Sequence, residues 1–127
     1  MADENIRQIT PFMHVDKMER AFEFFALIGF ECLFQERGYA YFQRGPAAVR
    51  VMQSTKEESG TPHEPHRGFC YYVDVADVDP LVAEIAPKLH VAGIEFMGPR
   101  NQPYFQREFM IRAPDGNVFV FGAPIPR

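Results

Sequence analysis

The chain has 127 residues, a hydrophobic fraction of 46% and 13 phenylalanines, which is enough apolar material for one compact domain and argues against disorder. Its formal charge of −4 provides no basic surface for a nucleic acid, and no uncharged run is long enough to cross a membrane. The N-terminus is acidic and polar, unlike a signal peptide, so we expect a cytoplasmic protein.

The first half of the chain predicts one strand, one helix and three further strands. Residues 8–15 have the composition of a strand. Apolar residues recur at helical spacing over 17–28, with Asp16 as the expected N-cap and Gly29 as the residue that ends the helix. Turn-forming residues divide the three strands that follow, which are expected at 30–36, 39–44 and 47–53.

The second half repeats this order after a polar linker at 54–67. Residues 68–75 predict a strand, and Asp77 or Asp79 is expected to cap a helix that runs to about residue 89. Pro87 should bend or shorten that helix, because proline has no backbone N–H to donate. The remaining strands are expected at 94–97, 105–112 and 117–122.

The repeated order predicts an α+β fold made of two βαβββ modules. The modules span 8–53 and 68–123 and are joined by the linker 54–67, within a single domain of residues 1–127. Neither module could bury both faces of its sheet alone, so we expect the two to share a core.

Two segments carry a resemblance to a known family. Residues 11–30, with the pair Phe24-Phe25 before Ile28-Gly29-Phe30, resemble the first strand and helix of the glyoxalase/bleomycin-resistance/dioxygenase (vicinal oxygen chelate) superfamily. Residues 101–104 and 106–117 resemble the bleomycin-resistance-like members, although Ala113 stands where the family usually has Asp. The resemblance covers residues 8–123. It implies sheets that curl into an open, cup-shaped mixed sheet with the helices on its outer face.

The resemblance also identifies the positions at which metal-dependent relatives place their ligands. In this chain they are Thr10, Arg50, Gly68 and Val120. Glycine, valine and arginine are not metal ligands, and a lone threonine is a poor one. We therefore expect no metal at the usual site, no other cofactor and no catalytic residue.

Two enzymatic alternatives stay open. His14, His66 and Glu108 form a set of two histidines and one carboxylate, which could hold iron or zinc at a displaced site. Such a site would suit a glyoxalase-like or dioxygenase-like metalloenzyme. The other alternative is a metal-free enzyme in which Glu108 acts as a general base.

Alternation along the strands predicts which side chains face into the cup. The face is mostly apolar with a few polar groups, as in small-molecule sites. The predicted ligand-binding residues are Phe12, His14, Arg50, Met52, Tyr72, Tyr104, Phe105, Glu108, Met110 and Arg112. Arg50 needs either a partner, for which Glu108 is a candidate, or an acidic or carbonyl-bearing ligand.

These observations predict a binding protein that sequesters a small hydrophobic or aromatic ligand without a metal. The resemblance suggests a bleomycin-family antibiotic and hence a role in antibiotic resistance, although the chain lacks tryptophan and its acidic residues are not clustered on the cup strands. The resemblance also implies a homodimer, in which residues 1–8 could form an arm that crosses to the other subunit.

Overall fold

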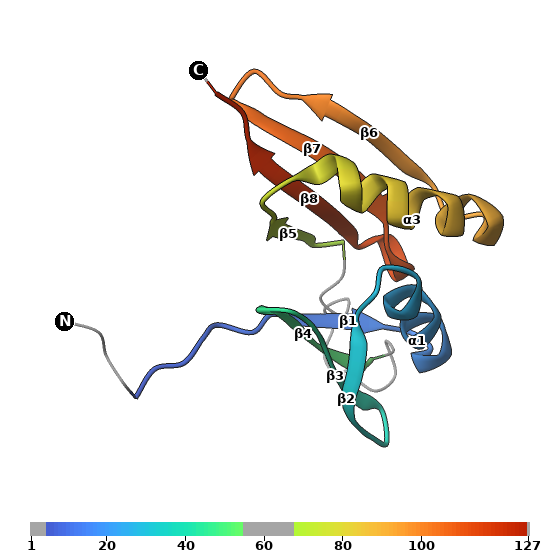
Figure 1. Ribbon diagram of the computed structural model, residues 1–127. Coiled ribbons are helices and arrows are strands. Elements are labelled where there is room, and N and C mark those ends of the chain that lie inside the picture. The colour runs from blue at the N-terminus through green and yellow to red at the C-terminus, as the bar shows by residue number, and fades with distance from the viewer. Residues whose placement is uncertain (1–4, 55–67, 127) are drawn as a thin grey trace.

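The computed structural model describes residues 5–54 and 68–126. Two four-stranded mixed sheets contain the strands of these described residues (Figure 1). Sheet A contains β1 (Phe12–Val15), β2 (Glu31–Glu36), β3 (Tyr39–Arg44) and β4 (Ala47–Gln53), and sheet B contains β5 (Cys70–Asp74), β6 (Phe96–Asn101), β7 (Gln106–Arg112) and β8 (Val118–Pro124).

The two sheets have the same topology. Their strand orders are β1-β4-β3-β2 and β5-β8-β7-β6, and in each sheet the first and last strands of the module pair in parallel while the others pair antiparallel. The α+β fold with a repeated βαβββ order is confirmed. β1 starts later and β6 ends later than the sequence predicted, at Phe12 and Asn101.

The first helix, α1 (Met18–Leu27), lies where helical periodicity placed it. The prediction that Asp16 caps it is wrong, because the N-cap is Lys17 and no side chain caps the helix. Asp16 lies one residue earlier, and its backbone N–H donates a hydrogen bond to Asp115 Oδ2 at 2.9 Å. This residue therefore connects the two modules.

The second helix, α3 (Val78–Ala92), has Asp77 as its N-cap, one of the two predicted candidates, and the Asp77 side chain accepts a hydrogen bond from the Asp79 N–H. The expected shortening at Pro87 is wrong, because the helix continues to Ala92 and ends at Gly93 in the left-handed conformation. Leu89, which follows the proline, is fully buried in the core. Its packing explains why the last turn stays helical despite the missing hydrogen bond.

Aromatic side chains from both modules form one shared core. Phe119 of β8 packs edge-on against Phe24 and Phe25 of α1, with ring centres 5.5 and 5.6 Å apart. Phe25 in turn stacks on Phe42 of β3 at 4.3 Å. These rings are fully buried, so the helices cover one face of the sheets and leave the other face for solvent or a ligand. No helix among the described residues is long and apolar enough to span a membrane.

Polar contacts also join the modules. Asn117, which is fully buried, accepts hydrogen bonds at 3.1 Å from the backbone N–H groups of Gly68 and Phe69. Its amide nitrogen donates to the carbonyl of His14, at 3.3 Å, and to that of Pro114. Every hydrogen-bonding group of this side chain is therefore used, and β1 is held beside the start of β5.

Candidate functional site

The sheet faces opposite the helices carry large hydrophobic side chains in contact with solvent. Four of these side chains are 37–42% exposed: Phe12, Met52, Tyr72 and Met110. Each of them is next to a buried core residue in its own strand, as alternation requires. Exposed apolar side chains that gather on one face are found at binding sites more often than elsewhere on a protein surface.

On sheet A, Arg50 lies among three aromatic side chains. Its neighbours across the strands are Phe12 of β1 and Tyr41 of β3. The guanidinium carbon lies 4.9 Å from the centre of the Tyr41 ring, and Nη1 donates a hydrogen bond to the Tyr39 hydroxyl. The rings of Phe12 and Tyr39 are 6.1 Å apart. The cation is therefore held against an aromatic surface.

His14 lies on the same face, at the end of β1. Its Nδ1 is hydrogen-bonded to Ser54 Oγ at 2.8 Å, and its ring centre is 6.3 Å from that of Phe12. The ring is half-buried. These contacts hold His14 in one orientation at the edge of the aromatic surface.

On sheet B, Glu108 is a buried carboxyl group, with 6% of the residue exposed. The Tyr104 hydroxyl donates a hydrogen bond to Glu108 Oε1 at 2.7 Å. The Tyr72 hydroxyl reaches both Glu108 and Gln106 Oε1, the latter at 3.1 Å. A buried carboxyl group needs such donors, because the surrounding side chains have displaced its water.

These contacts change the ionisation of neighbouring groups. At Tyr72, desolvation and then the hydrogen bond to Glu108 raise the pKa, whereas at Tyr104 the hydrogen bond to Glu108 is the main cause of a raised pKa. Desolvation and then the negative charge of Glu108 also raise the pKa of the Cys70 thiol. Near neutral pH the site therefore offers uncharged hydroxyl and thiol groups around Glu108.

A glycine allows this arrangement. Gly122 of β8 is the cross-strand neighbour of Glu108, and the Tyr72 ring lies across it. A Cβ at position 122 would come within 2.8 Å of Tyr72 Cε1 and closer still to Cζ and the hydroxyl oxygen. The missing side chain therefore lets the Tyr72 ring lie over the strand and bring its hydroxyl to Glu108.

The structure divides the predicted site residues between the two sheets. Sheet A carries Phe12, His14, Arg50 and Met52, and sheet B carries Tyr72, Glu108, Met110 and Arg112. Tyr104 and Phe105 lie in the loop before β7, and Phe105 has a positive φ of 65°. Arg112 is exposed and forms an ion pair with Glu95 at 3.3 Å, so its charge has a partner.

The suggested pairing of Arg50 with Glu108 is wrong. Arg50 of β4 contacts tyrosines of sheet A, whereas Glu108 of β7 contacts Tyr104 on sheet B. Sequence reasoning also missed Tyr39 and Tyr41 as parts of the Arg50 surface. Alternation within 39–44 was the available signal, because it places both tyrosines on the face opposite the buried side chains of β3.

The described residues do not fit a catalytic metal ion. Within residues 5–54 and 68–126, no three His, Cys, Asp or Glu side chains come together as a ligand set. His14 lies on sheet A and Glu108 on sheet B, and His66 of the proposed displaced site lies outside the described residues. The positions Thr10, Arg50, Gly68 and Val120 offer at most one weak donor.

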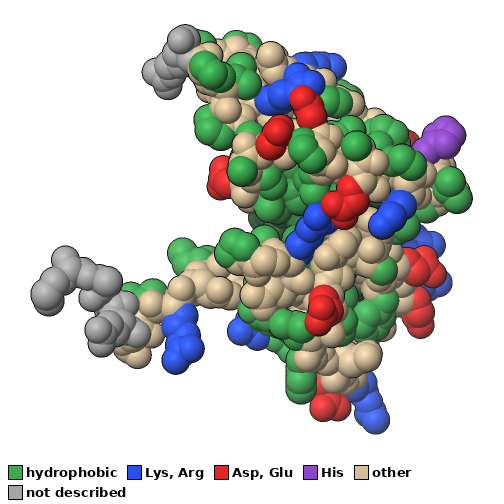
Figure 2. Space-filling view, in the orientation of Figure 1, with side chains coloured by type: hydrophobic (Ala, Val, Ile, Leu, Met, Phe, Trp, Pro, Cys, Tyr) green, Lys and Arg blue, Asp and Glu red, His purple; other side chains and the backbone are tan. Residues whose placement is uncertain are grey.

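One hollow of the described residues lies beside these faces, and another lies on the helix side. A mostly apolar cleft of about 490 Å³ lies between the modules and is lined by residues 46–49 and 70–74, with Ile9, Pro11, Phe30 and Phe119. The hollow between the modules, with hydrophobic side chains at its floor, is visible in Figure 2. Because Cys70 and Tyr72 line it, this cleft continues the exposed face of sheet B.

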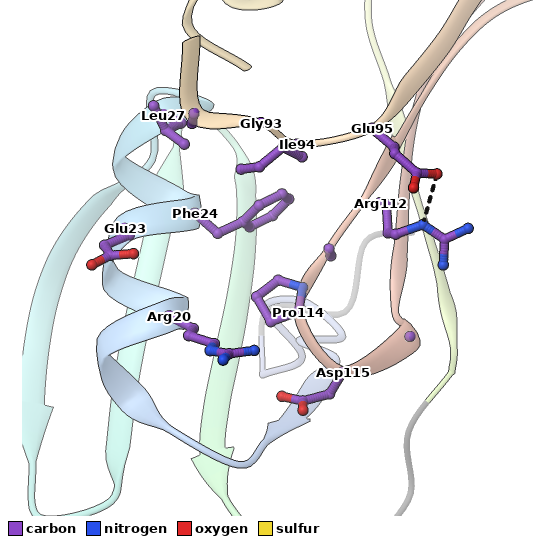
Figure 3. A pocket seen from close by; sticks show the side chains of 13 residues that line it. Arg20, Glu23, Phe24, Leu27, Gly93, Ile94, Glu95, Arg112, Pro114 and Asp115 are labelled. Atoms are coloured by element: carbon purple, nitrogen blue, oxygen red, sulfur yellow. Dashed lines mark hydrogen bonds and ion pairs between the residues drawn. The ribbon is translucent and has the colours of Figure 1, made fainter. Parts of the chain in front are cut away.

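The second hollow, of about 500 Å³, lies on the helix side between α1 and residues 92–95 and 112–116. In Figure 3, Arg20 and Asp115 lie at one end of it, and the ion pair of Glu95 with Arg112 lies at the other. Arg112 is the only predicted site residue that lines it. This second hollow is therefore separate from the two sheet faces.

Comparison with known proteins gives one family match. Residues 6–121 match the model of the Glyoxalase/Bleomycin resistance protein/Dioxygenase superfamily. No curated protein matches the chain by sequence.

Several solved structures share the fold. A bleomycin-binding protein from Streptomyces verticillus, complexed with copper(II)-bleomycin, is 20% identical, with a TM-score of 0.70 and full coverage of both chains. An antibiotic-binding protein from a Streptomyces species is 24% identical, with a TM-score of 0.69 over 96% of this chain and 99% of that one. Lactoylglutathione lyase from Agrobacterium tumefaciens is 18% identical, with a TM-score of 0.69 over 94% and 96%. The similar proteins thus include both binders and an enzyme, so the fold alone does not decide the function.

Proposed function

The chain belongs to the Glyoxalase/Bleomycin resistance protein/Dioxygenase superfamily, and from this premise we propose that it binds a small hydrophobic or aromatic ligand on the exposed faces of its sheets, without a metal. The observation that carries the proposal is the set of half-exposed aromatic and methionine side chains opposite the helices. Phe12 and Met52 lie on sheet A, and Tyr72 and Met110 lie on sheet B. Covering one such side chain with a ligand would contribute roughly 1 kcal/mol. Several together support specific binding of a small molecule.

A bleomycin-family antibiotic is the first ligand to test. Bleomycin-binding proteins share the fold, and Glu108 provides an acceptor for a cationic or hydrogen-bond-donating part of such a ligand. The experiment is an isothermal titration of metal-free and copper-loaded bleomycin into the dialysed protein. We expect saturable binding at about one ligand per chain.

The control compares two exposed apolar side chains, one on the proposed binding face and one on a helix. Phe12→Ala should weaken binding about tenfold, because Phe12 lies on the exposed face of sheet A. Val91→Ala on α3 should leave it unchanged, because Val91 is 88% exposed on the helix. Absence of heat at high bleomycin concentration would remove the antibiotic and redirect the search to other aromatic compounds.

We also propose that the protein is a homodimer and that it works in the cytoplasm. The described part of the N-terminal segment extends away from sheet A (Figure 1), and it exposes Ile6 by 70% and Ile9 by 95%. Such side chains support contact with a second copy of the chain. Light scattering after size exclusion should give twice the chain mass, and replacing both isoleucines with serine should lower that mass towards the monomer.

No observation favours the enzymatic alternatives over binding. Incubation with iron, zinc or manganese followed by dialysis should leave no stoichiometric metal, since the described side chains form no ligand set. Metal retained by the wild-type protein and lost in His14→Ala would favour the metalloenzyme instead.

A further inference from the structure

The two exposed faces differ in charge. The Arg50 face consists of Arg50 with Phe12, Tyr39, Tyr41 and Met52 on sheet A, and it presents a cation among aromatic rings. The corresponding face of sheet B contains the buried Glu108. A negatively charged ligand group would be attracted to the first face and repelled by the second.

Arg50 differs from the other arginines that have side-chain partners. Arg44, Arg107 and Arg112 each form an ion pair with a carboxylate, at 2.8, 3.0 and 3.3 Å. Among the described residues, no carboxylate forms an ion pair with Arg50, and its contacts are the two neutral tyrosines. A half-buried guanidinium gains most from an anion that it does not yet have.

The geometry leaves the guanidinium ready to bind one. Of its five N–H donors, the contacts within the described chain use one, to the Tyr39 hydroxyl. The ring of Tyr41 lies against the cation, and the Tyr41 hydroxyl accepts a hydrogen bond from Gln8 at 3.2 Å. Both tyrosines therefore help to hold the group in one orientation, which lowers the entropy cost of binding.

We propose that the Arg50 face binds an aromatic acid, a small molecule with an aromatic ring and a carboxylate, sulfonate or phosphate group. The anion meets the Arg50 guanidinium and the ring covers the half-exposed Phe12 and Met52 side chains. This inference rests on the proposed binding function and specifies the chemical class of a ligand for the face of sheet A, whereas the antibiotic considered above would use Glu108 of sheet B. It assigns the anion to sheet A because sheet B has Glu108 in the equivalent region.

The test uses two fluorescent probes with the same rings. One is 8-anilino-1-naphthalenesulfonate, and the other is its uncharged parent, N-phenyl-1-naphthylamine. We expect the wild-type protein to bind the sulfonate about tenfold more tightly at low salt. Arg50→Met should remove that preference and leave the affinity for the uncharged probe within about twofold, since methionine keeps the apolar part of the side chain.

Arg20→Met is the matched control, because it removes the same charge from an exposed position on α1, on the helix side of the molecule and away from both sheet faces. It should change neither affinity. A measurement on the wild-type protein keeps the test independent of the variants, because addition of the sulfonate should shift the NMR signal of the Arg50 Nε–H group. The uncharged probe should leave that signal in place.

The outcomes separate the inference from the proposed function. If neither probe binds, binding on the sheet faces fails, and the inference fails with it. If both probes bind equally, or if the sulfonate preference survives Arg50→Met, ligand binding stands but the assignment of an aromatic acid to the Arg50 face is overturned. A preference lost in Arg20→Met would overturn it as well.

Discussion

Gly122→Ala should destabilise the protein through the side chain of Tyr72. The added Cβ would come within 2.8 Å of Tyr72 Cε1 and closer to the hydroxyl, so the ring must leave its place over β8. The move breaks the hydrogen bond that the Tyr72 hydroxyl donates to Gln106 Oε1 and takes the hydroxyl away from the Glu108 carboxyl group. The backbone itself is not strained, because Gly122 lies in a strand without a positive φ.

The magnitude follows from these contacts. A hydrogen bond between neutral groups contributes about 0.5–1.5 kcal/mol. The upper end applies here because the Tyr72 hydroxyl, which donates to Gln106, also interacts with the Glu108 carboxyl group. Alanine gains roughly 0.5 kcal/mol over glycine in a strand, since glycine loses more conformational freedom on folding. We therefore expect Gly122→Ala to lower the free energy of unfolding by about 1 kcal/mol.

A double-mutant cycle tests the reasoning. Urea denaturation followed by circular dichroism suits this chain, which has no tryptophan. With Tyr72→Ala already in place, Gly122→Ala should cost nothing or stabilise slightly, which gives a coupling energy of about 1–1.5 kcal/mol. An equal cost in both backgrounds would refute the steric explanation, because the loss would then arise from the backbone or from the opposite face of β8.

Asn117→Ala should lower the free energy of unfolding by about 2 kcal/mol in urea, because two backbone N–H groups lose their acceptor. Glu84→Gln should cost less than about 1 kcal/mol at neutral pH, since its ion pair with Arg44 is partly exposed. The hydrogen bond from Arg44 lowers the pKa of Glu84, so the advantage of the wild type should be present above pH 4.5 and be lost as the pH falls through the lowered value. Desolvation raises the pKa of Tyr71 from 10.0 to about 12, so its contribution should be complete below pH 10 and decline as the pH rises towards 12, and Tyr71→Phe should reduce that decline.

Each of these three predictions would be contradicted by a specific result. An unchanged unfolding midpoint for Asn117→Ala would mean that water replaces the amide oxygen. A pH dependence of stability that persists in Glu84→Gln would assign it to another carboxylate. If Tyr71→Phe leaves the alkaline decline unchanged, the titration that causes it belongs to other groups.

The ends of the two helices show which features local sequence signals can predict. The sequence offered Asp77 or Asp79 as the cap of α3 and Gly29 as the residue that ends the first helix. Both signals involve only neighbouring residues, and the structure has Asp77 as the cap and Gly29 with a positive φ of 80°. The wrong predictions, at Asp16 and Pro87, concern residues whose environment depends on distant parts of the chain. Asp16 binds Asp115 across the modules, and the turn after Pro87 is held by packing of Leu89 into the core.

In the candidate site, too, the sequence predicted the local features and not the contacts between strands. Alternation indicated that Phe12 and His14 share one face of their strand and that Arg50 and Met52 share one face of theirs, because a period of two holds within any single strand. Their cross-strand contacts were not available from that pattern. Tyr41 faces Arg50 only through the register of β3 with β4, and the irregular pairing of β6 with β7 shows that register can shift within one strand pair.

The sequence by itself determined the order of the elements, the repeated βαβββ modules and the side of each strand that carries the mixed, exposed side chains. These features follow from periodicity and capping, which act over a few residues. Only the tertiary structure decided that Arg50 and Glu108 lie on different sheets with different partners. It also decided that Tyr72 reaches Glu108 across Gly122. Such contacts depend on strand register and on the packing of the modules through Phe119 and Asn117, which join residues far apart in the chain.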